Sequence, residues 1–114
     1  MESIQLSLFD EIEPPAQTWD EEMLEKEIQR GCIDNARSTV KAIAIDSCFS
    51  IPAIVDAMKT NYGTGGHSVE KGFIDYNGSG FRLWLWGEER VEKKYTWKQA
   101  AQKLIELIVR EETI

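Results

Sequence analysis

The chain has 114 residues and a net charge of −7, with one histidine and two cysteines. This length suits a single small domain with an appended tail and is too short for two hydrophobic cores. The charge is uneven: residues 1–30 hold nine acids and two bases, whereas residues 31–114 hold eleven of each. Residues 59–110 hold nine bases and six acids. That excess is too small to predict tight duplex binding, although it leaves room for a local nucleic-acid contact.

Neither secretion nor membrane insertion is indicated. The N-terminus lacks a basic start with a continuous apolar stretch, and no run approaches the roughly 20 apolar residues of a membrane span. We therefore expect a cytoplasmic protein with no membrane partner. Cys32 and Cys48 lack metal-ligand spacing and sit in apparently helical surroundings, which predicts buried, reduced thiols and leaves a disulfide as the lesser alternative. With one histidine and two scattered cysteines, the sequence predicts neither a metal site nor a bound cofactor.

The first motif along the chain is a short polar and apolar run at residues 5–9. A glutamine amide can donate and accept hydrogen bonds at a pocket rim, and the leucine and phenylalanine side chains can fill an apolar cleft. Pro14 and Pro15 follow after several acids, and they stop a helix and favour an extended exit. We predict that residues 1–17 form a flexible tail that presents a docking peptide, and that residues 18–114 form the folded domain.

These five residues resemble, at every position, the consensus pentapeptide with which bacterial polymerases, mismatch-repair proteins and mobile-element proteins bind the sliding clamp. They do not resemble the eukaryotic clamp-binding box, which needs two aromatic residues where this chain has Glu11 and Ile12. The alternative is that these apolar residues cover an edge of the core. The resemblance implies that the bacterial DNA polymerase sliding clamp is a partner. The implied clamp-binding residues are Gln5, Leu6, Ser7, Leu8 and Phe9.

The folded domain is expected to open with a helix. Thr18 followed by Glu21 predicts a capping box, and the helix should run through Arg30 and end at Gly31. Its core-facing residues are predicted to be Trp19, Met23, Leu24 and Ile28.

Two further helices are expected in the middle of the chain. Apolar residues at helical spacing predict one from residue 35 or 36 to about residue 47. The next should begin at Ser50, with Pro52 in its first turn, and end at Gly63.

The second half of the chain predicts strands followed by a last helix. Residues 72–76 and 81–86 read as a hairpin joined by a glycine-rich turn, and a third strand is expected at about residues 91–95. Thr96 with Gln99 predicts a capping box for the final helix. The expected fold class is α+β, with helices packed around a small three-stranded antiparallel meander.

From about Thr18 to Glu112 the chain resembles a module found in large helicase and DNA-methylase proteins of Gram-positive conjugative elements. Pentapeptides like the one at residues 5–9 also occur in those proteins. The helicase and methylase parts are absent here, so the resemblance implies a phage or conjugative-element setting and DNA metabolism but none of their catalysis. The matching segments are the acidic helix ending at Arg30-Gly31, residues 50–62, residues 61–68, the hairpin at residues 75–81, and residues 95–104.

The predicted strand at residues 81–86 is a candidate binding surface. Alternation places Phe81, Leu83 and Leu85 on one face, and an arginine and two tryptophans on the other. An open aromatic face could stack the bases of single-stranded nucleic acid or bind a second protein. With equal weight, helices could cover both faces of the sheet and bury the tryptophans. The candidate nucleic-acid or partner-binding residues are Arg82, Trp84, Trp86, Lys93, Lys94 and Lys98.

A glycine-rich segment at residues 63–68 is a weaker candidate. Successive glycine amides can form a nest for an anion, which makes Gly65, Gly66, His67 and Ser68 a candidate anion-binding turn. The segment lacks the Gly-Lys-Ser/Thr ending of a nucleotide-binding loop, and a plain helix-to-strand turn is the favoured interpretation. A serine next to a histidine in sequence does not place a nucleophile opposite a base. We predict no catalytic residues, and a hydrolase built around His67 is the least favoured function.

These features predict a non-enzymatic accessory protein that docks on the sliding clamp. Its body would bind single-stranded or structured DNA, or a second protein, at sites of replication or repair. The alternative is an inhibitor of a host function, acting by occupying the clamp cleft or by acidic mimicry of DNA. Mimicry is the weaker version, because the excess acids are confined to residues 1–30 and lack extended phosphate-like spacing.

Overall fold

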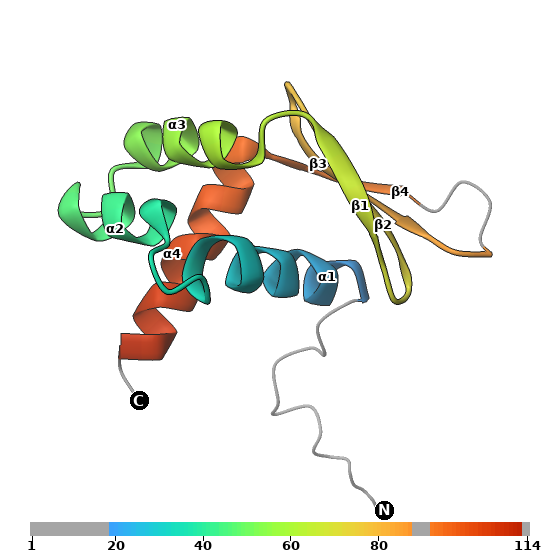
Figure 1. Cartoon of the computed structure of the whole chain (residues 1–114), viewed down its shortest axis with the longest axis horizontal. Coiled ribbons are helices and arrows are strands. Elements are labelled where there is room, and N and C mark those ends of the chain that lie inside the picture. The colour runs from blue at the N-terminus through green and yellow to red at the C-terminus, as the bar shows by residue number, and fades with distance from the viewer. Residues whose placement is uncertain (1–18, 88–91, 113–114) are drawn as a thin grey trace, which may run out of the picture.

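The computed structural model of the chain describes residues 19–87 and 92–112. It has helices on one side and a sheet on the other (Figure 1). The α+β prediction is confirmed. The helical elements are α1 (Trp19–Ile28), a π-helical turn η2 (Gln29–Ile33), α2 (Thr39–Asp46), α3 (Ile51–Tyr62) and α4 (Trp97–Glu112). The strands are β1 (Gly65–Val69), β2 (Gly72–Asn77), β3 (Gly80–Leu85) and β4 (Glu92–Thr96).

The sheet is an antiparallel meander in the order β1-β2-β3-β4. The sequence predicted three strands, and β1 is the one it missed. Its residues were interpreted as a turn because the segment is rich in glycine. In the structure the burial of alternate residues along it is incomplete. Pairing with β2, from Gly65 opposite Tyr76 to Val69 opposite Gly72, makes it a strand.

The hairpin of β2 and β3 is confirmed, with Tyr76 opposite Phe81 and Asn77 opposite Gly80. The Asn77 side-chain oxygen accepts a hydrogen bond from the backbone N–H of Ser79 at 2.7 Å and closes the turn. Such an Asx contact explains why this sequence forms a tight connection.

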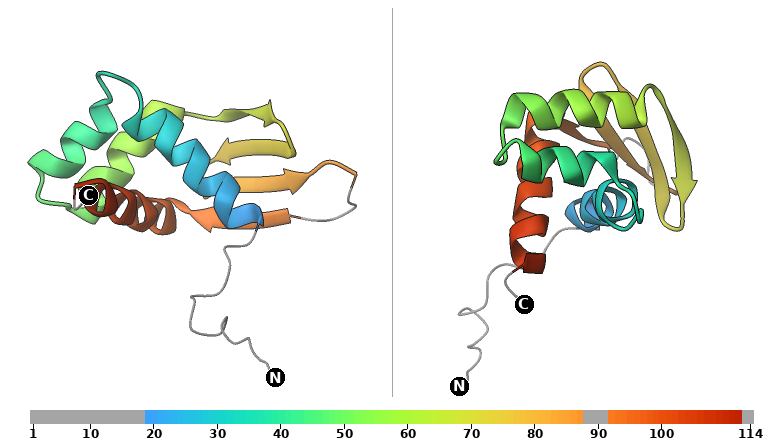
Figure 2. Two further views of the ribbon diagram at one scale, coloured as in Figure 1. Left: turned by 90° about the horizontal axis from the view of Figure 1, so that it is seen from below. Right: turned by 60° about the vertical axis from the view of Figure 1, so that its left-hand side comes forward.

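α1, α4 and the C-terminal end of α3 pack against one face of the sheet, and α2 packs on α3 away from the strands (Figure 2). Between the two layers four aromatic rings pack together. Tyr62 of α3 lies 4.6 Å from Tyr76 and 5.2 Å from Phe81 between ring centroids, and Phe81 lies 5.1 Å from Trp97 of α4. Offset and edge-to-face pairs of this kind add to the free energy of burial. Of these rings Phe81 is fully buried, and further fully buried large side chains include Leu24, Ile28, Ile54, Met58, Ile74, Leu83, Leu104 and Ile108.

Two helix starts follow their predicted capping. Ser50 accepts a hydrogen bond from the backbone N–H of Ala53 ahead of α3. Thr96 and Gln99 form the reciprocal capping box of α4: the Thr96 hydroxyl accepts from the Gln99 N–H at 3.1 Å, and the Gln99 side chain accepts from the Thr96 N–H at 2.9 Å. The predicted box at Thr18 lies outside the described residues.

The C-terminal end of α1 and the start of α2 differ from the prediction. Gly31 does not terminate a helix; it lies within η2, where a Cβ atom would stand 2.2 Å from the Tyr62 hydroxyl oxygen. The glycine is thus required by the close approach of α3. The second helix begins at Thr39, because Ser38 caps it by accepting from the Lys41 N–H.

Both cysteines are free thiols, in agreement with the prediction, but their burial differs. Cys32 is buried in η2, whereas Cys48 is exposed. Cys48 falls in the tight connection between α2 and α3, where it and Phe49 both have positive φ angles, of 56° and 62°. The prediction that Cys48 is buried was wrong because the helical pattern ends just before it.

Candidate functional site

The predicted clamp-binding residues, Gln5 to Phe9, lie outside the described residues. The described chain begins at α1, whose first turn contains Asp20, Glu21 and Glu22. The remaining candidates all lie in the described part of the domain.

A surface of the sheet faces away from the helices. On β2, Ile74 and Tyr76 are buried, whereas Phe73 and Asp75, which alternate with them, are half-buried. The register places the same alternation on the neighbouring strands. We call this surface the open face. Its defining residues are Phe73, Asp75, Arg82, Trp84 and Lys94.

The two aromatic residues of the open face are paired across the central strands. Phe73 stands directly opposite Trp84, and both are half-buried. No helix of the described residues packs over them, because the helices occupy the face that carries Phe81 and Leu83 (Figure 2). Of the two interpretations of the tryptophan strand, the structure therefore favours the open one.

Charged residues form the next row of the open face. Arg82 stands opposite Asp75 on one side and Lys94 on the other. Its guanidinium pairs with the Asp75 carboxylate, and its central carbon lies 5.6 Å from the centroid of the Trp84 ring. Asp75 thus holds the arginine beside the aromatic pair, in a cation–π arrangement.

A shallow hollow of about 460 Å³ borders this charged row. Arg82 and Lys94 line it, together with the β2–β3 turn. Residue 80, in the same lining, must be glycine because a Cβ atom there would lie 2.0 Å from the Tyr95 carbonyl oxygen of the neighbouring strand.

Three predicted members of the candidate surface are not among the residues that define the open face. Trp86 follows the end of β3, is 54% exposed, and donates from its indole nitrogen to the Val69 carbonyl at 3.2 Å. Lys93 stands opposite buried Leu83, so it belongs to the other side of the sheet. Lys98 is exposed on α4.

The candidate anion-binding residues Gly65, Gly66, His67 and Ser68 lie in β1 rather than in a turn. Their backbones run in register with β2. His67 shares the side of its register partner Ile74, which is buried against the helices, while Ser68 is exposed. Anion binding by these residues stays a prediction, and the structure gives His67 a different set of contacts.

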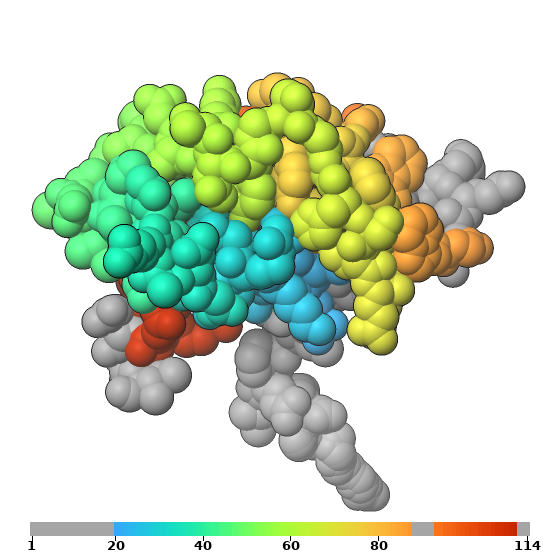
Figure 3. Space-filling view, viewed as in Figure 1, coloured from blue at the N-terminus to red at the C-terminus, as the bar shows by residue number. Residues whose placement is uncertain are grey.

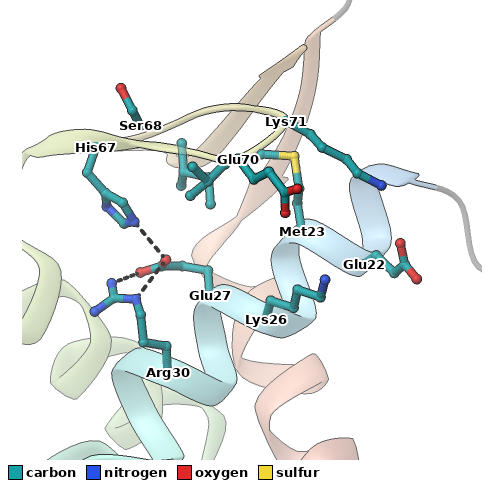
Figure 4. Close-up of a pocket in the computed structure, with 11 residues that line it drawn as sticks. Glu22, Met23, Lys26, Glu27, Arg30, His67, Ser68, Glu70 and Lys71 are labelled. Carbon is teal, nitrogen blue, oxygen red and sulfur yellow. Dashed lines mark hydrogen bonds and ion pairs between the residues drawn. The ribbon is translucent and has the colours of Figure 1, made fainter. Parts of the chain in front are cut away.

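His67 belongs to a polar network centred on Glu27 of α1, whose side chain is 2% exposed. Arg30 donates to the Glu27 carboxylate at 2.5 and 3.3 Å, and the Tyr76 hydroxyl donates to it at 2.5 Å. The His67 Nε2 atom lies 3.3 Å from the same carboxylate (Figure 4). A buried carboxylate is expensive unless it is paired and hydrogen-bonded, and Glu27 has both kinds of partner.

The network also reaches the interior. The Tyr62 hydroxyl donates to the Glu27 carbonyl at 3.1 Å and lies 3.6 Å from the Cys32 sulfur. Burial and, next, the hydrogen bond to Glu27 raise the pKa of Tyr76 above its ordinary value. Burial raises the pKa of the Cys32 thiol to about 11, although its hydrogen bond to Tyr62 acts in the opposite direction. Both groups are therefore protonated at neutral pH, and neither is set up as a nucleophile.

Both ring nitrogens of His67 have protein partners. Nε2 faces Glu27, and Nδ1 lies 3.2 Å from the Tyr76 hydroxyl. His67 would have to leave this network before it could act as a base on a bound substrate. In the observed geometry the network fastens α1 to β1 and β2.

A groove of about 410 Å³ runs beside the network, between α1 and the hairpin of β1 and β2. These two segments lie side by side on the face shown in Figure 3. Apolar residues contribute to its lining, and its polar lining includes both signs of charge, so no single ligand charge is selected. Its lining residues are Glu22, Met23, Lys26, Glu27, Arg30, His67, Ser68, Val69, Glu70, Lys71 and Ile74.

Sequence reasoning missed Glu27 as part of a site. The available signal was its position: Glu27 follows Met23 by four residues and Leu24 by three, so it falls on the apolar stripe of α1. A carboxylate on such a stripe needs buried partners. Arg30, one turn later, is the nearest candidate partner in the sequence.

Within residues 19–87 and 92–112, no group of three or more histidine, cysteine or carboxylate side chains is arranged to hold a metal ion. In the same ranges, no helix combines the length and the apolar character needed to cross a membrane. No protein-family model matches the chain, and no curated protein or solved structure matches it.

Proposed function

We propose that this chain is a non-enzymatic accessory protein of a phage or conjugative element that docks on the bacterial DNA sliding clamp. It acts in the cytoplasm and brings a small binding domain to sites of replication and repair. The observation that carries this proposal is the pentapeptide at residues 5–9, which matches the clamp-binding consensus at all five positions. Gln5, Leu8 and Phe9 supply the polar contact and the apolar side chains that fill the clamp cleft.

The arrangement of the domain supports a two-part protein. Its described core is built from residues between Met23 and Ile108, and the open face lies on the side of the sheet away from the helices. A clamp-binding segment and a second binding surface can then act together. Tethering raises the effective concentration of the second surface at DNA, so that surface needs little affinity of its own. Residues 31–114 hold equal numbers of acids and bases, which predicts weak binding of the domain to DNA and agrees with a domain that is held there by a tether.

Inhibition by occupying the clamp cleft follows from the same pentapeptide and is the second candidate. Acidic DNA mimicry is less well supported, because acids of α1 are used within the domain. Glu27 is buried and paired with Arg30. Glu25 lies 3.4 Å from Lys103 of α4. Charges that are paired internally contribute little to a phosphate-like surface.

The direct test is calorimetric titration of the purified protein into a bacterial sliding clamp. We expect a micromolar dissociation constant, and we expect the Gln5/Leu8/Phe9 triple alanine variant to lose binding. Ser3→Ala, just outside the pentapeptide, is the matched control and should bind normally.

The melting temperature of each variant completes the experiment. If the triple variant binds no clamp but melts as the original protein does, the residues serve docking. A large drop in its melting temperature would instead place them in the core and contradict the proposal. Primer extension at clamp-saturating protein concentrations separates the two candidates, because an inhibitor blocks extension and an adaptor does not.

A further inference from the structure

We propose that the open face binds single-stranded DNA, with Phe73 and Trp84 stacking against bases and Arg82 and Lys94 contacting phosphates. The choice of DNA rests on the proposed function, since clamp docking would hold the domain beside DNA. The nucleic-acid character of the ligand rests on the geometry of the face.

The aromatic pair is placed as a stacking platform. Phe73 and Trp84 belong to the two central strands and stand opposite each other, so their Cβ atoms are about 5 Å apart. Both side chains are half-buried, which leaves part of each ring to solvent. Exposed aromatic residues on neighbouring strands of an antiparallel sheet are a recurrent way to bind unpaired bases, whose flat faces are free.

The edge of the face next to this pair carries little side-chain bulk. Gly66 of β1 lies beside Phe73, and a Cβ atom there would stand 3.1 Å from the Phe73 ring and 2.3 Å from the Ile74 carbonyl oxygen. Its φ of +155° is a further reason for glycine. Ser68, the register partner of Phe73, is small and exposed. At these two positions no large side chain blocks the approach of a flat base.

The cations are adjacent to the platform. Arg82 and Lys94 are register partners, and Arg82 precedes Trp84 by two residues, or about 7 Å along the strand. Both line the hollow of about 460 Å³ at this end of the sheet. The Asp75 carboxylate offsets one of the two charges and orients the guanidinium. A phosphate site at Arg82 thus lies next to a stacking site at Trp84 along β3, as a phosphate lies next to a base in a single strand.

The small number of cations sets the expected salt dependence. With about two phosphate contacts, the slope of log affinity against log salt should be about −1.4 for a single strand. Such binding is weak in isolation, which agrees with a domain that works from a tether.

The test uses fluorescence anisotropy of a labelled oligothymidylate of about 15 nucleotides with the full chain at low salt. We expect Trp84→Ala and Phe73→Ala each to weaken binding by about 5-fold to 100-fold. Trp84→Phe should keep most of the affinity because it retains an aromatic ring. Trp84→Leu, which keeps apolar bulk without the ring, should behave as the alanine variant does.

A second pair of variants, one test and one control, examines the phosphate contacts. Lys94→Glu should weaken binding and reduce the salt slope. Lys59→Glu makes the same change of charge at an exposed position of α3, in the helical layer, and should leave the affinity within about twofold.

Absence of binding at low salt would overturn the proposal. So would normal binding by a folded Trp84→Ala variant. A Trp84→Leu variant that binds as tightly as Trp84→Phe would also overturn it, because apolar bulk and not ring stacking would then carry the affinity. Equal affinity for a duplex of the same length would overturn the stacking mechanism, and equal or tighter binding of the matching RNA would overturn the choice of DNA. Clamp titration of the same samples keeps the two proposals separate, because it does not involve the open face.

Discussion

The two faces of the sheet use the same residue types for different purposes. On the covered face, Tyr62, Tyr76, Phe81 and Trp97 form a continuous ring cluster between helices and strands. On the open face, Phe73 and Trp84 are half-buried and stand beside an ion pair at the surface. Aromatic content alone therefore does not distinguish a core from a binding surface; the alternation of the strand and the side chosen by the helices do.

The polar groups of the two faces also differ. Glu27 lies at the covered side with its carboxylate bonded to Arg30, His67 and Tyr76. Arg82 and Asp75 form an ion pair whose partners are 36% and 20% exposed. Because the Glu27 network is buried, it should contribute to the stability of the fold. Solvent weakens the attraction between the charges of Arg82 and Asp75. The expected effects of substitution follow this order.

The largest effect is expected from the covered aromatic cluster. Phe81→Ala removes a side chain that is 1% exposed and should lower the free energy of unfolding by about 3–5 kcal/mol. Phe73→Ala, the same change on the open face, should cost about 1 kcal/mol. Urea denaturation of both variants measures the difference. Equal losses would show that the two faces do not differ in packing.

The Glu27 network should rank second. Glu27→Gln keeps the shape of the side chain but removes the charge that Arg30 and His67 contact, so we expect a loss of about 2–3 kcal/mol. Glu25→Gln is the matched change two residues earlier, where the partner ammonium of Lys103 lies 3.4 Å away. It should cost about 1 kcal/mol or less. A Glu25 variant as unstable as the Glu27 variant would contradict the special role of the network.

Alkaline pH should lower the free energy of unfolding through buried groups that lie between the helices and the sheet. Burial raises the pKa of Cys32 from 9.0 to about 11, and burial also raises the pKa values of Tyr62 and Tyr76. These groups stay protonated in the folded protein when the unfolded chain has already lost their protons, so their stabilising effect is complete below about pH 9 and declines as pH rises. Cys32 alone should account for about 2 kcal/mol by pH 11.

Denaturation curves from pH 8 to pH 11 check this decline. Cys32→Ala lowers the starting stability by leaving a cavity, but it should show a shallower fall from pH 9 onward. A variant with the same slope as the original protein would mean that the Cys32 thiol does not contribute to the pH dependence.

The smallest effect on stability is expected from the open face. Trp84→Ala should change the free energy of unfolding by about 1 kcal/mol or less, because the ring is half-buried and the helices pack on the other side. Thermal denaturation followed by circular dichroism measures it. A loss comparable with that of Phe81→Ala would place Trp84 in the core.

Local signals in the sequence predicted most of the elements. Ser50 with Pro52, Thr96 with Gln99, and the Asn77 turn each act within a few residues, and each appears in the structure as expected. Strand alternation likewise predicted that Phe81 and Leu83 would share one face and that Trp84 would lie on the other, as the structure has them, but it left open which face the helices would cover.

The misses depend on contacts between distant parts of the chain. Gly65 and Gly66 form a strand because β2 pairs with them, which no local propensity indicates. Gly31 is enclosed by Tyr62, 31 positions later, so its resemblance to a helix terminator was misleading. Glu27 meets His67 and Tyr76 only in the folded protein, which is why the network could not be assembled from spacing.

The order of the strands has a consequence for how the domain folds. Each strand pairs with the next one along the chain, and β4 leads directly into α4, so these elements can form from neighbouring segments at a low cost in loop closure. The bond between Glu27 and Tyr76 spans 49 residues and joins the first helix to the middle of the sheet. We therefore expect α1 to join the sheet after the meander has formed.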